Sequence, residues 1–150
     1  MDEVPAERRS LAERLLSEAY EFVLSGWCQD ADAVDECMRA IEPASAFARR
    51  WSAAGALERA WQRSSEPADL AADAHETALL ALVAVIRADP AAWNDREGRR
   101  QSEVLDALAE ALHRLAGAGI VDDLDYVGPR LAGADAVSDA GLRAETPREP

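Results

Sequence analysis

The stretch PADLAADAHETALLALVAVIRA, from Pro67 to Ala88, decides the predicted fold. It is rich in alanine and leucine, which are strong helix formers, and it has proline only at its first position. We therefore expect one long helix, ended by Asp89-Pro90 because the residue before a proline is disfavoured in the helical region. Residues 78–86 are apolar on every side of this helix, which predicts that it is the central, buried helix of the domain.

Segments at both ends of the chain also have apolar residues at helical spacing. Residues 5–25 predict a helix that stops at Gly26. Residues 102–116 predict another, capped by Ser102 and stopped by Gly117. Two long flanking helices could cover the central one.

The middle of the chain predicts two further helices. Residues 30–41 place their apolar side chains on one side and are followed by Pro43, which favours a short helix. Ser45 is a suitable N-cap for a longer one, because apolar residues recur every three or four positions from Phe47 to Trp61. Gly55 lies within that face and suggests close approach of another helix. The fold class is therefore all-α, a compact bundle of four to five helices.

The domain boundary is expected near residue 119. Residues 1–119 form the predicted helical domain, and glycine, proline and acidic residues are frequent beyond it. For residues 120–150 we expect a short docked segment, near 120–132, followed by a largely mobile acidic tail.

Composition excludes several classes of function. The 150 residues carry a net charge of -13, which argues against direct binding of nucleic acid or of an anionic membrane. All the basic residues are arginine, so lysine-dependent chemistry, such as that of pyridoxal-phosphate enzymes and P-loop nucleotide hydrolases, is excluded. The N-terminus lacks the pattern of a signal peptide, and the longest apolar run is too short for a membrane span, so we expect a cytoplasmic protein.

The polar loop from residue 89 to 102 is the most suggestive candidate site. One interpretation is structural: Trp93 closes the end of the bundle, Asn94 or Asp95 forms an Asx turn, and an arginine pairs with Asp95. The other is functional, with this loop as the rim of a polar pocket and a carboxylate as general base or anchor. Loops on rigid helical scaffolds often carry function, so both interpretations stay open.

The remaining candidates are one cysteine and two histidines. Cys28 follows a predicted helix end and could be a nucleophile if His75 or His113 lay beside it, although a small buried packing residue is the favoured interpretation. Glu110 and His113 have the spacing of half a di-iron motif, but the second copy is missing. We therefore predict no metal site and no cofactor.

Several sequence blocks together resemble a known family. They are Gly26-Trp27-Cys28, residues 51–60 (WSAAGALERA), residues 91–95 (AAWND), and Glu103-Val104-Leu105 with Leu108. They resemble a family of small proteins of actinobacteria and their phages that is known as a domain of unknown function, over about residues 8–116. Ser52 stands where members usually have cysteine, and residues 30–43 are compact where members have a longer loop. The resemblance implies no reaction, cofactor or substrate, but it places Trp27, Trp51 and Trp93 with Asn94 and Asp95 in the common frame.

Two functions are consistent with these features. The first is a small cytoplasmic module, monomeric or homodimeric, that binds a protein or a small molecule without chemistry of its own. Its contacts are expected among the aromatic and polar side chains Trp27, Gln29, Trp51, Trp93, Asn94, Asp95, Arg99 and Arg100. The alternative is a small acid/base enzyme of accessory or natural-product metabolism. Its pocket would lie between Trp27–Gln29 and Trp93–Arg100, with Asp95 as the reacting group, either alone or together with a histidine.

Overall fold

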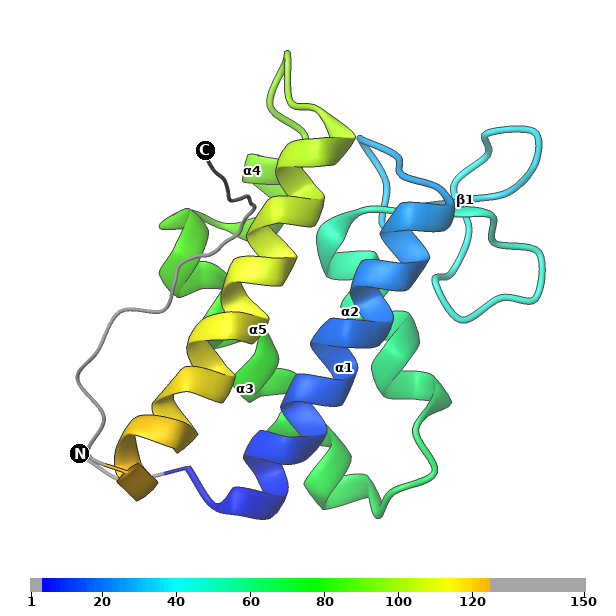
Figure 1. Ribbon diagram of the computed structural model, residues 1–150. Helices are drawn as coiled ribbons and strands as arrows, with labels where there is room; N and C mark the ends of the chain where they lie inside the picture. The colour runs from blue at the N-terminus through cyan, green and yellow to red at the C-terminus, as the bar shows by residue number, and fades with distance from the viewer. Residues whose placement is uncertain (1–3, 125–150) are drawn as a thin grey trace, which may run out of the picture. The chain divides into compact units, whose positions relative to one another are not determined.

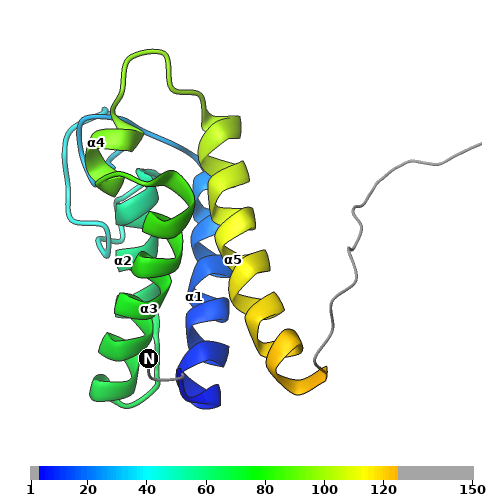
Figure 2. The same ribbon diagram turned by 90° about the vertical axis from the view of Figure 1, so that its left-hand side faces the viewer.

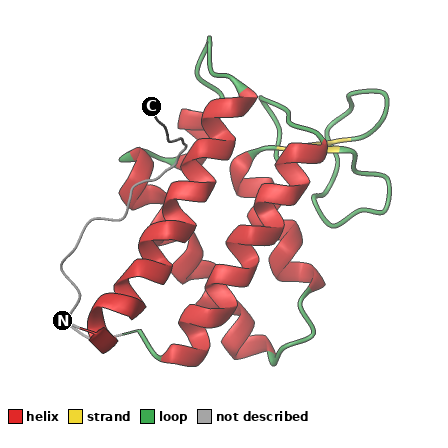
Figure 3. Ribbon diagram, in the orientation of Figure 1, coloured by secondary structure: helices red, strands yellow, loops and turns green. Residues whose placement is uncertain are grey.

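The fold was obtained as a computed structural model, which describes residues 4–124 (Figures 1 and 3). This part of the chain contains five helices and one two-stranded sheet. The helices are α1 (Ala6–Ser25), α2 (Ala53–Arg63), α3 (Ala68–Ile86), α4 (Pro90–Asn94) and α5 (Gln101–Leu124), and the strands are β1 (Ala33–Val34) and β2 (Arg50–Trp51). The all-α helical class is thus confirmed. The predicted docked segment and mobile tail lie almost entirely outside the described residues.

Helix α1 occupies the centre of the bundle. It lies between α5 on one side and α2 and α3 on the other (Figure 2). Its buried residues include Leu11, Leu15, Leu16, Ala19 and Val23. Many other core side chains are alanine, which allows the helices to approach closely.

The prediction that α3 is the central, buried helix is wrong. Its buried residues, Ala71, Ala74, Ala78 and Leu82, form one face, whereas Leu80 is 61% exposed. An apolar run permits a helix to be buried on every side, but it does not determine how many other helices pack against it.

The predicted helix over residues 30–41 is also wrong. Asp30 and Met38 have positive φ angles, 69° and 67°, which an α-helix cannot contain. The Asp35 carboxylate accepts hydrogen bonds from the backbone N–H groups of Cys37 and Arg39 and forms a tight turn. The segment is therefore a loop that contains β1.

Helix α2 begins later than its apolar spacing predicts. Ser45 accepts a hydrogen bond from the Phe47 N–H in a local turn, and the chain then runs extended through β2, where Trp51 pairs with Ala33. Ser52 is the true N-cap, since its hydroxyl accepts the N–H of Gly55 at 3.0 Å. The predicted start of the helix at Ser45 is therefore wrong, because the residues before Ala53 form a turn and a strand.

Gly55 does mark a close approach, but its neighbour is a loop and not a helix. A Cβ at this position would lie 1.9 Å from the backbone oxygen of Asp32. Gly26 ends α1 in extended backbone, and a Cβ there would lie 2.5 Å from the backbone oxygen of Arg49. Both glycines let the 30–52 segment lie directly against the helices.

The region predicted as a polar loop contains α4. Asp89 caps this helix by accepting the N–H of Ala92, and Pro90 occupies its first turn. Helix α5 is not capped by Ser102. Glu103 instead accepts the backbone N–H of Arg100, which holds the pKa of the Glu103 carboxyl below its ordinary value. The helix also continues through Gly117 to Leu124.

Candidate functional site

Asn94 is the centre of a buried hydrogen-bond network. Its side chain is fully buried at the end of α4. Oδ1 accepts from the indole Nε1 of Trp27 at 2.9 Å and from the backbone N–H of Ala53 at 3.0 Å. Nδ2 donates to the carbonyl of Cys28 at 3.1 Å and to Asp95 at 3.0 Å. Both donors and both acceptor positions of the amide are thus used by the protein itself.

Neighbouring side chains extend this network. Gln29 donates from Nε2 to the carbonyls of Asn94 and Arg96, both at 3.0 Å. Oδ1 of Asp95 accepts the N–H of Asp30 at 2.9 Å. The two segments that were expected to frame a pocket are therefore joined directly. A depression of about 260 Å³ beside this network is lined by Asp30, Ala31, Asp32, Ser52, Ala91 and Asp95.

Arg99 secures the other side of the same turn. Its Nε donates to the carbonyl of Trp93, and its guanidinium lies 3.8 Å from the centre of the Trp93 ring. Its ion pair is with Glu103, at 3.4 Å. The predicted pairing of an arginine with Asp95 is wrong for residues 4–124, where Arg99 and Arg100 pair with Glu103 and Oδ1 of Asp95 accepts two N–H donors. Arg100 also pairs with Glu103 and is exposed.

Cys28 is a buried thiol with backbone neighbours. Its Sγ lies 3.6 Å from the carbonyl of Ala31 and 3.7 Å from that of Arg50. Burial, together with the negative charges of Asp95 and Asp32, raises its pKa from the ordinary value of 9.0 to about 11. A thiol in this environment is protonated at neutral pH, which opposes a role as nucleophile.

The histidines lie in other surroundings. His75 stacks on Trp61 with 4.4 Å between ring centres, and burial lowers its pKa. His113 is exposed, and Glu110 pairs with Arg114 at 2.7 Å. Neither histidine is hydrogen-bonded to Cys28 or Asp95 in the part of the chain that the structure describes. No metal-binding group of three or more acidic, cysteine or histidine side chains occurs among residues 4–124.

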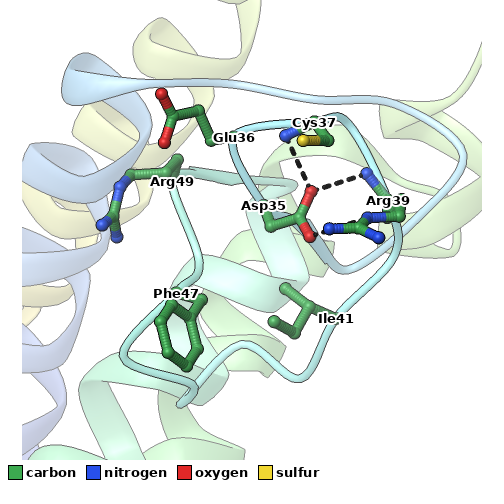
Figure 4. A pocket seen from close by; sticks show the side chains of 7 residues that line it. All are labelled: Asp35, Glu36, Cys37, Arg39, Ile41, Phe47 and Arg49. Atoms are coloured by element: carbon green, nitrogen blue, oxygen red, sulfur yellow. Dashed lines mark hydrogen bonds and ion pairs between the residues drawn. The ribbon is translucent and has the colours of Figure 1, made fainter.

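A second candidate site lies on the loop of residues 35–49. Asp35, Glu36, Cys37, Arg39, Ile41, Phe47 and Arg49 line a depression of about 380 Å³ (Figure 4). Phe47 is 69% exposed and the neighbouring Met38 is 59% exposed. Hydrogen bonds from the backbone N–H groups of Arg39 and Cys37 hold the pKa of the Asp35 carboxyl below its ordinary value. This loop presents large apolar side chains on a hydrogen-bonded frame.

The comparisons with known proteins identify the family. Residues 5–114 match the model of a family of unknown function, DUF6197. The chain belongs to this family. No curated protein and no solved structure matches it. Membership of DUF6197 agrees with the resemblance to a domain of unknown function, and it assigns neither a reaction nor a ligand.

The DUF6197 match contains both the Asn94 network and the 35–49 loop. The sequence brought Trp27, Gln29, Trp93, Asn94 and Asp95 to attention, and the structure places them together. Trp51 is buried beside them, and its indole donates to the carbonyl of Pro43. The loop surface was missed because Phe47 had been assigned to a helix face. The signals that could have revealed it are the residue types of Asp35 and Pro43, each of which is frequent in turns.

None of the helices in this DUF6197 chain, over the residues described, is long and apolar enough to cross a membrane.

Proposed function

We propose that the protein is a small, cytoplasmic, non-catalytic module that binds another protein through the 35–49 loop. The observation that carries this proposal is the exposure of Phe47 and Met38 on a loop whose backbone is fixed by internal hydrogen bonds. Exposed aromatic residues are frequent hot spots of protein interfaces. A loop that is already ordered loses little conformational entropy when a partner binds.

The base of the loop is held by Arg59 from α2. Its Nη1 donates to the carbonyls of Pro43 and Ser45, at 2.8 and 2.9 Å. The indole of Trp51 donates to the same Pro43 carbonyl at 3.0 Å. These bonds fix the segment that leads to Phe47, so its ring is presented in a defined position.

The acid/base enzyme at Asp95 is less well supported. Oδ1 of Asp95 accepts hydrogen bonds from the Asp30 N–H and from Nδ2 of Asn94, so this carboxylate joins neighbouring segments, and Cys28 is protonated at neutral pH. The two histidines bond to neither Asp95 nor Cys28 among the described residues. Acid/base catalysis commonly uses a second titratable group to return the proton, and neither histidine is bonded to Asp95 to fill that role in the described part of the chain.

The proposal is tested by affinity capture from cells of the source organism with two matched variants. Phe47→Ser removes the exposed aromatic, whereas Leu80→Ser removes a comparably exposed apolar side chain from α3. A partner should be captured by the unmodified protein and by Leu80→Ser, and lost with Phe47→Ser. With that partner purified, Phe47→Ser should weaken binding by about thirtyfold, the effect of a hot spot worth about 2 kcal/mol.

Equal capture by all three proteins would refute the proposal. Size-exclusion chromatography with light scattering checks the other expected partner, a second copy of the chain. If the mass is that of a dimer and Phe47→Ser makes it a monomer, the partner is the protein itself.

A further inference from the structure

Three arginines beside the 35–49 loop have no carboxylate partner among the described residues. They are Arg49 at the end of the loop and Arg59 and Arg63 on α2, and the ion pairs of the described residues involve other arginines. The chain has 29 acidic residues against 16 arginines. Other described arginines also lack an ion pair, but these three are distinguished by lying near one another. We call these three residues the arginine surface.

Aromatic rings and backbone carbonyls hold the arginine surface in place. The guanidinium of Arg59 lies 5.2 Å from the centre of the Phe22 ring and 5.1 Å from that of Trp51. The guanidinium of Arg63 lies 5.6 Å from the Phe22 ring. Arg49 donates from Nη1 to the carbonyls of Ala46 and Ala48. Each guanidinium has five N–H donors, so donors are left for an external acceptor.

The positive charges of this surface are not neutralised from within. Burial lowers the pKa of Arg59, and the nearby positive charges of Arg63 and of Arg49 lower it further. The Nε of Arg59 is buried and has no hydrogen-bond partner. An anionic ligand would relieve the repulsion between the arginines.

We propose that the arginine surface binds an acidic segment of a partner protein, with carboxylates on Arg49 and Arg63 and an apolar side chain against Phe47. This inference rests on the proposed function, because it gives the chemistry of the partner that the loop binds. Arg49 and Phe47 line the same depression, whose acidic members are Glu36 and the Arg39-paired Asp35 (Figure 4). Arginine suits such a ligand, since its planar guanidinium matches the geometry of a carboxylate.

The net charge of the chain favours a short acidic segment over a nucleic acid. Nucleic acids carry one charge per phosphate over their full length, so their binding is opposed by the acidic surface around three arginines. A peptide can place its carboxylates only where the arginines lie.

The test is an NMR titration of the full chain with a short peptide rich in Glu and Leu. The Nε–Hε signals of Arg49, Arg59 and Arg63 should shift, and that of Arg96, which has no ion pair among the described residues, should not. The double variant Arg49→Gln/Arg63→Gln should weaken binding roughly tenfold, the product of a few-fold loss for each exposed ion pair. Arg96→Gln is the matched control and should bind as the unmodified protein does.

Several results would overturn the inference. The first two are that the arginine signals do not shift, and that a peptide with Gln in place of Glu binds as tightly as the Glu peptide. The other two are that the double variant binds the peptide as tightly as the unmodified protein does, and that the same arginines bind a single-stranded DNA but not the peptide. Circular dichroism of each variant verifies that it is folded. A captured partner that is lost with Phe47→Ser but kept with full affinity by the double variant would leave the proposed function standing and refute the acidic segment. If the peptide binds through the arginines but Phe47→Ser has no effect on partner capture, the acidic segment stands and the proposed function is refuted.

Discussion

Replacing Asn94 by alanine should destabilise the protein more than any other substitution in its polar network. The change removes all four hydrogen bonds of the amide and leaves the Ala53 N–H and the Cys28 carbonyl without partners. Both groups belong to buried residues, and each buried polar group without a partner costs about 1–3 kcal/mol. The indole of Trp27 is only partly buried and can reach water, so it adds less.

The expected loss is therefore about 2–6 kcal/mol out of the roughly 5–15 kcal/mol that holds a small domain folded. Urea unfolding followed by circular dichroism measures it without relying on the fluorescence of the nearby tryptophans. Asp95→Ala is the comparison variant, because it leaves one buried group without its partner, an Nδ2 hydrogen of Asn94, while the exposed Asp30 N–H can turn to water. Its cost should be about 1–3 kcal/mol, half of that expected for Asn94→Ala. If Asn94→Ala costs no more than Asp95→Ala, the network is not what joins these segments.

Two further predictions concern packing and a thiol. Gly55→Ala should lower the free energy of unfolding by about 2–3 kcal/mol although alanine has the better helix propensity, because the new Cβ meets the backbone of Asp32. Gly117→Ala has nothing within 4 Å of the new Cβ and should raise the free energy of unfolding by about 0.5–1 kcal/mol. Equal urea midpoints for the two variants would contradict this prediction. Ellman's reagent should react with the exposed Cys37 in the folded protein and with Cys28 only after unfolding. Folding raises the pKa of Cys28 from 9.0 to about 11, so as the pH rises the unfolded chain loses this proton first and the folded state becomes less stable. Between pH 9 and 11 the free energy of unfolding should therefore fall more in Cys37→Ser, which keeps Cys28, than in Cys28→Ala/Cys37→Ser, which lacks it.

The sequence predicted the helices that are set by local spacing. Residues 5–25 and 67–88 have a continuous apolar pattern without internal breakers, and both form helices close to those limits. Between residues 30 and 52 the same reasoning fails, because Phe47 and Trp51 also fit a loop and a strand that is paired with distant residues. In this segment the pairing of Trp51 with Ala33 decides that a strand forms, and the spacing of apolar residues along the chain contains no information about that contact.

The composition of the candidate site was partly predictable, but its chemistry was not. Trp27, Gln29, Asn94 and Asp95 attract attention because tryptophan and amide side chains are costly to bury without partners. Whether such side chains surround a ligand or one another depends on where two segments some 65 residues apart meet, and here they meet in direct hydrogen bonds. The structural interpretation of this loop therefore has the stronger support, apart from the arginine that was expected on Asp95.

The Asn94 network and the exposed loop belong to one continuous framework. From Asn94 the hydrogen bonds reach Cys28, whose N–H donates to the carbonyl of Trp51, and the indole of Trp51 donates to Pro43 at the base of the loop. Each link is a buried or partly buried bond between rigid groups, so a change at Asn94 should alter the position of Phe47 as well as the stability. Partner binding by Asn94→Ala should then weaken even under conditions where the variant is fully folded. The amide hydrogens of the loop should also exchange faster in the free variant than in the unmodified protein, because the loop is held less firmly. Unchanged exchange in the loop would show instead that Arg59 and the hydrogen bonds within the loop hold it, and would confine the role of the network to the stability of the fold.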